Sequence, residues 1–337
     1  MVASPVTADP VADPHLTPVL RLPPAKLNLT LAVVGRREDG FHDLHSVFVP
    51  LDLTDRLSLA PAATAREDSL HVTGFDAGPV GDNLVLRAIA AARAAVGEGP
   101  GRPGTPALAA RLEKHIPVAA GLGGGSSDAA AAFDGSLEAW GADLDDERRA
   151  HAAASIGSDV PFFLRGVPAL VEGRGERLTP LRGVNGHPGI LLVTPRVAVR
   201  TPDVFAVFHA IRGSGEGSIR MSSEHLAQEL GNGLSATDLV ARAGVLASAN
   251  DLLPAALLVA PELLGVKRAL TRTLTRAVGL SGSGPTLWTL YPSLAEAQAA
   301  AEVVEAAVAA GTIPSIGDGP PSIIATTIHT GHEVPTP

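Results

Sequence analysis

A glycine-rich segment followed by two serines is the part of the sequence best suited to bind a phosphate. Residues 117–133 read P-V-A-A-G-L-G-G-G-S-S-D-A-A-A-A-F. Glycines such as Gly124 can adopt positive φ and let the backbone approach a ligand closely. Residues 126–128 (S-S-D) include preferred N-cap residues, and the alanines at 129–132 favour a helix. Exposed N–H groups at a helix N-terminus attract anions, so we expect this loop to hold a phosphate.

Two common phosphate loops and a simple linker are the alternatives for this segment. The Gly-Lys-Ser/Thr ending of a Walker A loop is missing, and Ser126 stands where a dinucleotide fingerprint starting at Gly121 requires its third glycine. A flexible Gly/Ser linker fits the composition alone, but linkers do not usually lead directly into a strong helix start. We therefore expect a nucleotide phosphate held by a third kind of loop.

Three further segments contain residues that could act on a phosphate, although each has an ordinary explanation. Lys26 begins an apolar strand-like run, where a lysine is more often a solvated charge at a strand edge. Asp159 lies among apolar neighbours, but an aspartate two residues before Pro161 also suits an N-cap or a turn. The small-residue loop 281–286 (S-G-S-G-P-T) resembles many turns.

The elements that must position these residues predict an α+β protein with two lobes. Strands and helices are mixed without regular βα alternation, and Pro and Gly cluster around 180–188. Strands are expected at 26–34, within 46–59, at 107–114, near 169 and 190, at 286–291 and at 323–329. Helices are expected at 83–96, after the glycine loop, and at 145–156, 202–211, 222–230, 250–278 and 293–310. The expected domains are a disordered tail at 1–20, an N-terminal domain at 21–183, a C-terminal domain at 184–330 and a tail at 331–337.

Composition excludes several classes of function. The chain has 337 residues, 45% of them hydrophobic, which is ample for a large core. It has no cysteine, which excludes disulfides, thiolate metal sites and a cysteine nucleophile. The net charge of −9 without a basic run argues against nucleic acid or an anionic membrane as partner. With no signal peptide and no apolar stretch of about 18 residues, we expect a soluble, cytoplasmic protein.

Taken together, these segments resemble the signature motifs of the GHMP small-molecule kinases. The resemblance runs nearly from Pro24 to Ile328. Besides the glycine loop, the Asp159 segment and loop 281–286, it rests on P-A-K-L-N-L-T-L from Pro24, R-R-E-D-G-F-H at 36–42, D-N-L-V-L-R-A at 82–88, E-G-R-G-E at 172–176 and A-N-D-L at 249–252. The triple glycine with Ser-Ser, and the D-G-aromatic-H segment, narrow it to the branch whose substrate carries a cytidine diphosphate group. The departures are Phe41, where tyrosine is common, and a longer N-terminal tail.

The resemblance implies a two-lobed GHMP kinase fold, with an N-terminal lobe like a ribosomal-protein domain and a ferredoxin-like C-terminal lobe. It implies transfer of the γ-phosphate of ATP to an alcohol, with Lys26 and Asp159 as catalytic pair. It places Asn28 at the reacting diol, Phe41 and His42 in a cytidine pocket, and Phe205 as a second stacking aromatic. It assigns ATP binding to Asn83, Pro117, Val118, Ala119, Ala120, Gly121, Leu122, Gly123, Gly124, Gly125, Ser126 and Ser127.

This assignment fits the chemistry, because phosphoryl transfer needs positioning and charge neutralisation more than covalent help. The positive charge of Lys26 would favour an ionised Asp159, which can orient the hydroxyl and accept its proton. Mg²⁺ would accompany ATP; Ser127 could touch it, and no Asp or Glu metal ligand is identified. There are two alternatives. One is a related kinase that acts on homoserine, mevalonate or a sugar, and the other is an inactive nucleotide-binding protein of the same fold. The expected partner is a small molecule, and both a monomer and a homodimer remain open.

Overall fold

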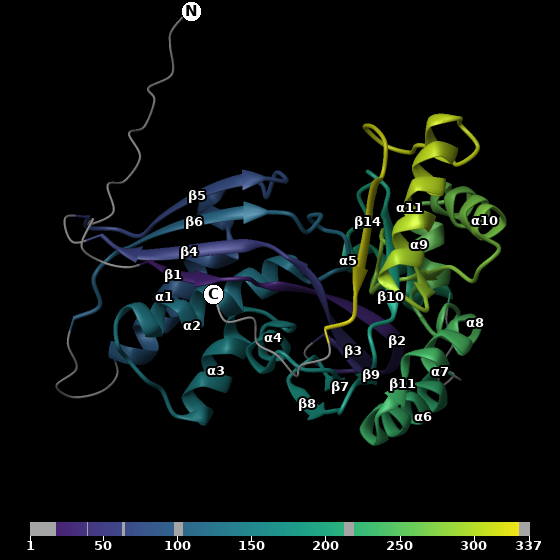
Figure 1. Ribbon diagram of the computed structural model, residues 1–337. Helices are drawn as coiled ribbons and strands as arrows, with labels where there is room; N and C mark the ends of the chain where they lie inside the picture. Colours follow the sequence, from purple (N-terminus) through teal and green to yellow (C-terminus); the bar gives the residue numbers. More distant parts are fainter. Residues whose placement is uncertain (1–17, 39, 63–64, 98–103, 212–218, 330–337) are drawn as a thin grey trace, which may run out of the picture.

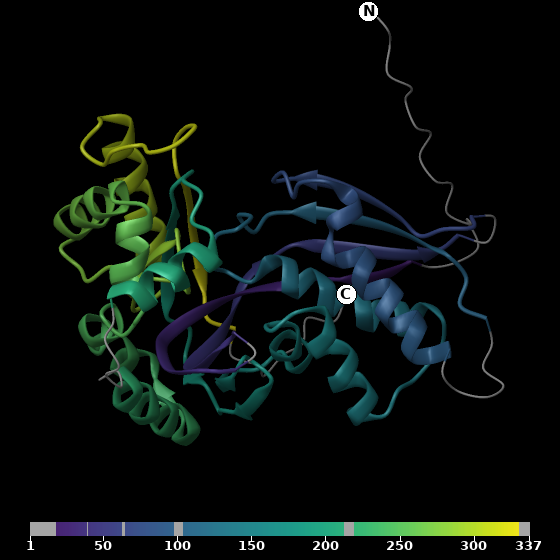
Figure 2. The same ribbon diagram turned by 180° about the vertical axis from the view of Figure 1, so that it is seen from behind.

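The computed structural model describes residues 18–38, 40–62, 65–97, 104–211 and 219–329. Seen from opposite sides, they form an N-terminal half and a C-terminal half, each built from sheets and helices (Figures 1 and 2). The predicted tail at 331–337 and most of the tail at 1–20 lie outside the described residues. Val19 and Leu20, which were assigned to that tail, belong instead to the first strand.

The outer sheet of the N-terminal half is covered on one face by helices. Its strand order is β1-β4-β6-β5, antiparallel except for the β5–β6 pair. The strands are β1 (Val19–Arg21), β4 (Arg56–Pro61), β5 (Ser69–Gly74) and β6 (Leu108–Lys114). The helices are α1 (Leu84–Gly97), α2 (Gly124–Ala139), α3 (Asp146–Ile156) and α4 (Val160–Arg165), after a short 3₁₀ turn η1 (Val80–Asp82). Apolar side chains of both layers form one core cluster, which holds α2 against the sheet.

The second N-terminal sheet is an antiparallel meander in the order β2-β3-β7-β8. Its strands are β2 (Pro24–Arg36), β3 (His42–Thr54), β7 (Ala169–Gly173) and β8 (Arg177–Pro180). Along β2, Asn28 lies opposite Phe48 but Thr30 lies opposite Val47, so Leu29 is an extra residue in the ladder. Such a β-bulge redirects the side chains next to it.

The C-terminal half is built on an antiparallel sheet in the order β12-β13-β10-β14. These strands are β10 (Gly189–Thr194), β12 (Gly279–Leu280), β13 (Leu287–Tyr291) and β14 (Ser322–Thr327), beside a small parallel pair, β9 (Val184–Asn185) and β11 (Leu234–Ser235). Its helices are α5 (Thr201–Ile211), α6 (Ile219–Asn232), α7 (Ala236–Ala241), α8 (Ala243–Leu246), α9 (Leu253–Val259), α10 (Glu262–Leu274) and α11 (Leu294–Ala309). Mixed strands and helices in two halves confirm the predicted α+β class.

Two predicted helices begin close to their expected first residues, and one long helix was predicted wrongly. The side chains of Asp145 and Ser293 accept N–H bonds at the starts of α3 and α11, as expected of N-cap residues. The single helix predicted at 250–278 is instead two helices, α9 and α10, with Ala260 and Pro261 between them. Proline has no N–H to donate, so it ends the first helix.

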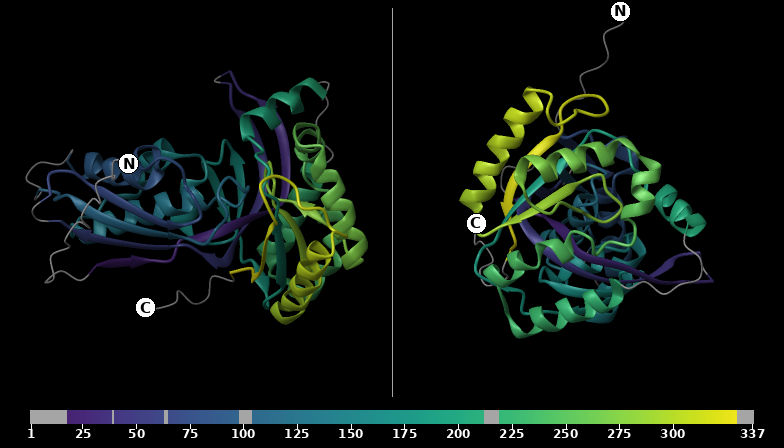
Figure 3. Two further views of the ribbon diagram at one scale, coloured as in Figure 1. Left: turned by 90° about the horizontal axis from the view of Figure 1, so that it is seen from above. Right: turned by 90° about the vertical axis from the view of Figure 1, so that its right-hand side faces the viewer.

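Strand β2 belongs to both halves of the molecule. Viewed from above, the long purple strands near the middle of the picture lie between the two halves (Figure 3, left). The N–H of Leu31 donates to the carbonyl of Ala249 at 2.7 Å, and the N–H of Asp251 donates to the carbonyl of Leu31 at 2.9 Å. Leu31 and Val33 pack in the same apolar cluster as the C-terminal sheet and helices. The strand that carries Lys26 is therefore anchored in both halves.

Candidate active site

The glycine loop lines a cavity of about 290 Å³ at the N-terminus of α2. All the predicted ATP-binding residues line it except Leu122, which is buried in the core, and Ser127, which lines a separate hollow beside Phe163. Gly121 and Gly123 have φ of +77° and +71°. Backbone N–H groups with little side-chain cover therefore line a concave site at a helix N-terminus, which is suited to phosphate.

The structure corrects two details of the predicted loop. The N-cap of α2 is Gly123, in the left-handed region, so Ser126 and Asp128 lie inside the helix and do not cap it. Gly124 is the first helical residue, and its φ is not positive. A side chain at Gly124 would still be crowded, because a Cβ there would lie 3.0 Å from Ile116 Cγ2. The loop needs glycine at 124 for space and not for backbone conformation.

The second small-residue loop braces the first. The hydroxyl of Ser281 donates to the carbonyl of Gly121 at 2.9 Å, and the N–H of Thr286 donates to the carbonyl of Ala120 at 3.3 Å. A Cβ on Gly121 would lie 2.3 Å from the carbonyl oxygen of Ser281. The two loops therefore touch through their backbones, and the C-terminal half helps to shape the phosphate cavity.

Lys26 and Asp159 face each other beside the glycine loop. Lys26 Nζ lies 3.9 Å from Asp159 Oδ2, and the N–H of Lys26 donates to the carbonyl of Leu122 at 2.9 Å. Lys26 is only 4% exposed, so it is not the solvated edge charge that was the ordinary alternative. Burial lowers the pKa of its ammonium group, and the negative charge of Asp159 opposes that effect.

The position of Asp159 agrees only in part with its ordinary explanation. It lies in a turn and is the N-cap residue of α4, but its side chain makes no capping hydrogen bond. The carboxylate is instead partly exposed and directed at Lys26. Asn28 completes this group, because its Oδ1 accepts a hydrogen bond from Lys26 Nζ at 2.5 Å. The structure thus brings Asp159 next to Lys26 and Asn28, two predicted residues of β2 that lie more than 100 positions earlier in the sequence.

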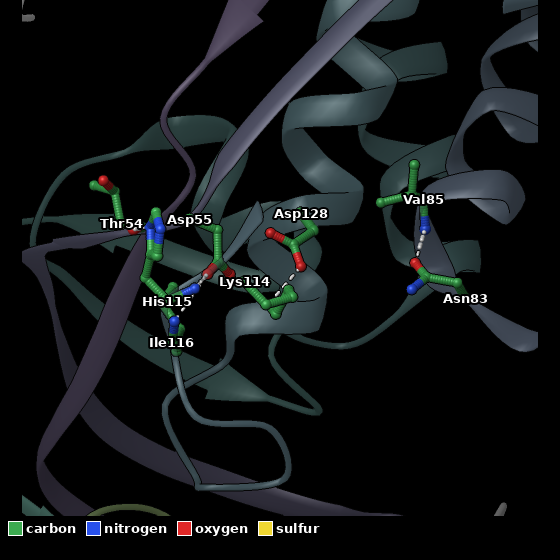
Figure 4. A network of polar contacts seen from close by, with 8 residues as sticks. All are labelled: Thr54, Asp55, Asn83, Val85, Lys114, His115, Ile116 and Asp128. Atoms are coloured by element: carbon green, nitrogen blue, oxygen red, sulfur yellow. Dashed lines mark hydrogen bonds and ion pairs between the residues drawn. The ribbon is translucent and has the colours of Figure 1, made fainter. Parts of the chain in front are cut away.

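A buried ionic cluster lies at the floor of the phosphate cavity and was missed by sequence reasoning (Figure 4). Lys114 Nζ donates to Asp128 Oδ2 at 2.7 Å and also to Asp55 Oδ2. Asp55 Oδ1 accepts the N–H groups of His115 at 2.5 Å and Ile116 at 2.8 Å. All three charged side chains are at most 4% exposed. The cluster therefore fixes the chain that leads into the loop.

Among the described residues of this cluster, Asp128 is the one whose carboxyl has an unpartnered oxygen and a raised pKa. Its second oxygen, Oδ1, is buried and has no hydrogen-bond partner among the described residues. Burial raises the pKa of the Asp128 carboxyl to about 7, although the charge of Lys114 opposes that shift. The floor of the cavity thus contains a carboxyl that titrates near neutral pH.

Asn83 lines the same cavity but is held by its own helix. Its Oδ1 accepts the N–H of Val85 at 3.0 Å, at the start of α1 (Figure 4). The side-chain NH₂ makes no hydrogen bond that fixes it elsewhere in the described residues, so it is available to a ligand. Asn83 therefore lies beside the glycine loop in the same cavity.

The aromatic residues predicted for the substrate pocket come from both halves of the chain. His42, at the start of β3, stacks on Phe205 of α5 with ring centroids 4.3 Å apart and an interplanar angle of 18°. His42 Nε2 also contacts His209 Nε2, a residue that the sequence did not single out. Burial lowers the pKa of His42, helped by the charges of His209 and Arg36. A neutral imidazole can both donate and accept a hydrogen bond.

Phe41 lies apart from that stack. It is 47% exposed, and the guanidinium of Arg174 lies over its ring, 3.6 Å from the centroid. Its carbonyl accepts the N–H of Arg37, which closes the turn between β2 and β3. Phe41 is therefore not part of the apolar core.

Comparison with known proteins shows the family to which the chain belongs. The family model for the GHMP kinases N terminal domain matches residues 83–167, which include the glycine loop and Asp159. A 4-diphosphocytidyl-2-C-methyl-D-erythritol kinase of Rhodopseudomonas palustris is 40% identical over 285 residues, covering 84% of this chain and 91% of that protein. The chain belongs to the family of 4-diphosphocytidyl-2-C-methyl-D-erythritol kinases. It is therefore a small-molecule kinase, and this family implies ATP as phosphate donor.

Solved structures agree with that family membership. The crystal structure of a 4-(cytidine 5'-diphospho)-2C-methyl-D-erythritol kinase matches with a TM-score of 0.67 and 33% identity, covering 92% of this chain and all of that one. A homoserine kinase from Cytophaga hutchinsonii matches with a TM-score of 0.66 but only 18% identity, so it shows the shared fold alone. These likenesses confirm the two-lobed GHMP kinase fold. Among the described residues, no helix has the length and apolarity needed to cross a membrane.

Proposed function

We propose that this protein transfers the γ-phosphate of ATP to the 2-hydroxyl of 4-diphosphocytidyl-2-C-methyl-D-erythritol, a step in making isoprenoid precursors by the non-mevalonate route. The observation that carries the proposal is the buried ammonium of Lys26, 3.9 Å from Asp159 and next to the glycine loop. The identity of the substrate rests on the relatives that carry this activity in their names.

The chain's own residues suffice for the roles that phosphoryl transfer requires. Asp159 orients the substrate hydroxyl and accepts its proton as the new O–P bond forms. The bond between the γ-phosphorus and the bridging oxygen breaks, and ADP leaves with that oxygen. Lys26 neutralises charge on the phosphoryl group, and the Asn28 amide holds the reacting diol. The backbone of the glycine loop holds the remaining phosphates.

We propose that Mg²⁺ accompanies the ATP. Magnesium binds few protein oxygens and keeps phosphate and water oxygens as its other ligands. The buried hydroxyl of Ser127 has no partner among the described residues and is the protein oxygen that we propose for this role, although in this structure it lines the hollow beside Phe163 and not the phosphate cavity. When bound, the ion would neutralise charge on the phosphates.

The cytidine end of the substrate would lie against Phe41, His42 and Phe205. The His42–Phe205 stack supports this, because it presents a flat aromatic surface and a neutral imidazole edge at one place. Stacking on such rings is worth roughly 1–3 kcal/mol per base. The two rings touch in this structure, so the base would stack on one outer face of the pair or separate them.

The proposal is tested by measuring ADP release with purified protein, ATP and Mg²⁺. We expect turnover with 4-diphosphocytidyl-2-C-methyl-D-erythritol, and none above background with homoserine, mevalonate or free methylerythritol. Turnover on homoserine or mevalonate alone would select a sibling kinase. ATP binding without turnover on any of these alcohols would select the inactive nucleotide-binding protein.

We further propose that the enzyme works in the cytoplasm, where ATP and nucleotide-linked intermediates are present. Its partner would be this small molecule, and neither nucleic acid nor membrane is needed for the reaction. Sedimentation of the purified protein would distinguish a monomer from a homodimer.

A further inference from the structure

The hydroxyl of Ser46 links the Asn28 side chain to the backbone of β2. Asn28 Nδ2 donates to Ser46 Oγ at 3.1 Å, and Ser46 Oγ donates to the carbonyl of Thr30. Ser46 is fully buried and Asn28 is 3% exposed. Because water has almost no access to these groups, each relies on the protein for its hydrogen bonds.

The β-bulge at Leu29 explains why a hydroxyl is needed there. In a regular ladder, the N–H of Val47 would donate to a backbone carbonyl of β2. Here it donates to the side-chain Oγ1 of Thr30 at 3.1 Å. The carbonyl of Thr30 is then satisfied by Ser46 Oγ–H. At the bulge, hydrogen bonds to side chains thus replace backbone–backbone hydrogen bonds between β2 and β3. The hydroxyl proton of Ser46 is used in one of them, the bond to the carbonyl of Thr30.

The hydrogen bond from Ser46 to the carbonyl of Thr30 fixes the orientation of the Asn28 side-chain amide. Ser46 Oγ has given its proton to a carbonyl, so it can only accept, and the NH₂ of Asn28 must face it. The amide oxygen then faces Lys26 Nζ, which has donors only, at 2.5 Å. A flipped amide would direct two donors at an ammonium group. The hydroxyl of Ser46 therefore selects the amide orientation that holds Lys26.

The ammonium group of Lys26 has further contacts that this orientation supports. It lies 4.7 Å from the centroid of the Phe48 ring and 3.9 Å from Asp159 Oδ2. The Asn28 oxygen is the shortest of these contacts. Without it, the flexible lysine stem has only a ring face and a carboxylate outside hydrogen-bond distance to fix its end.

We propose that Ser46 is a positioning residue for phosphoryl transfer, acting through Asn28 to hold the ammonium of Lys26 beside Asp159. Ser46 itself touches neither substrate nor nucleotide in this role. The inference rests on the proposed function, because it takes Lys26 to be the catalytic lysine.

The test compares Ser46→Ala with Ser46→Thr in the full-length protein. The alanine variant should lower kcat by about tenfold or more, the scale expected when a catalytic group is slightly misplaced. Its KM for ATP should stay near that of the native enzyme, since the glycine loop is untouched. Threonine keeps the hydroxyl and suits a strand, so it should restore most of kcat.

The pH dependence of kcat gives a second test, because it would not change if Ser46 had only a structural role. The Asn28 oxygen stabilises charged Lys26, so its loss should lower the pKa of the lysine further. The alkaline limb of kcat should then shift to lower pH in the alanine variant and return in the threonine variant.

Ser223→Ala is the matched control. Ser223 is as fully buried as Ser46, and its hydroxyl accepts from Thr30 Oγ1 at 2.9 Å, but it makes no contact with Asn28. This variant should lower the melting temperature while leaving kcat and its pH limb unchanged.

Three outcomes would overturn the positioning role. They are normal kcat in Ser46→Ala, an equal loss in the alanine and threonine variants, and an equal loss in Ser223→Ala. Lys26→Ala separates this inference from the proposed function. An inactive Lys26→Ala beside a normal Ser46→Ala rejects only the role of Ser46, whereas an active Lys26→Ala rejects the proposed catalysis and with it the role of Ser46.

Discussion

The imidazole of His42 lies flat on the ring of Phe205, with centroids 4.3 Å apart, although one residue begins a strand of the N-terminal half and the other belongs to a helix of the C-terminal half. His209, one turn further along that helix, contacts the same imidazole. The surface proposed for the cytidine group therefore exists only when both halves are folded together.

Phe205→Ala should raise the KM for the cytidyl substrate and leave the KM for ATP nearly unchanged. Losing one stacking face costs about 1–3 kcal/mol, or roughly 5- to 150-fold in affinity. Phe41→Ala should act in the same direction without loss of stability, because its ring is 47% exposed. Steady-state kinetics with both substrates and a melting curve check this. A parallel rise in both KM values would reject the stacking role.

Asp159→Asn should lower kcat by about 100-fold or more, the usual scale for loss of a positioned base. The fold should persist, because the Asp159 side chain caps no helix. Its negative charge also opposes the lowering of the Lys26 pKa by burial. Removing that charge lowers the lysine pKa further, so residual activity should decline at lower pH than in the native enzyme. Near-normal turnover would remove Asp159 from the chemistry.

Gly124→Val should weaken ATP binding far more than binding of the alcohol substrate. A Cβ at this position would lie 3.0 Å from Ile116 Cγ2 and 3.2 Å from Lys114 Nζ, so the side chain must displace the loop or the ionic cluster below it. Gly265→Ala is the control, since a Cβ there meets nothing within 4 Å and lies on helix α10. Calorimetry measures both affinities. Unchanged ATP affinity in a folded Gly124 variant would contradict the phosphate-loop assignment.

Asp128→Asn should make the free energy of unfolding depend less on pH between pH 4 and 8. The carboxyl ionises near pH 3.8 in an unfolded chain and at about 7 in the folded protein. Between these values the folded state binds more protons, so stability contributed by this group is present at low pH and is lost as the pH rises toward 7. Asparagine cannot titrate. Urea unfolding at several pH values between 4 and 8 measures the slope, and identical slopes in both proteins would exclude this role.

The site residues that lie inside sequence motifs were predicted from the sequence. The residues that reach the site only because of the folded structure, Lys114 and Asp55, were missed. Lys26, Asp159 and the glycine loop stand in segments whose types and spacing are informative on their own. Lys114 and Asp55 are single charges at the ends of strands, and nothing local distinguishes them from solvated residues. A weak indication existed, because Lys114 lies only three residues before Pro117, where the loop begins. Their burial is decided by the packing of α2 against two strands, which no short segment encodes.

The errors in the fold have similar causes. The region at 250–278 has continuous helical periodicity, and only the effect of Pro261 on the backbone divides it. The start of α2 was misassigned because serine and aspartate are better N-caps than glycine in isolation. Here a left-handed Gly123 is required, since a Cβ would lie 2.8 Å from the Phe163 ring. Close packing thus overrides the local preference.

The shared strand β2 has a consequence for how this enzyme denatures. Leu31 and Val33 fill the C-terminal core, while Leu27 and Leu29 on the same strand pack in the adjoining cluster. Melting either half alone would remove from β2, which is buried from residue 25 to residue 33, its neighbours in that half. Differential scanning calorimetry should therefore record one cooperative endotherm and no separate transition for each half. A fragment cut at the 183–184 junction should aggregate, because it would present an apolar edge that the complete chain never exposes.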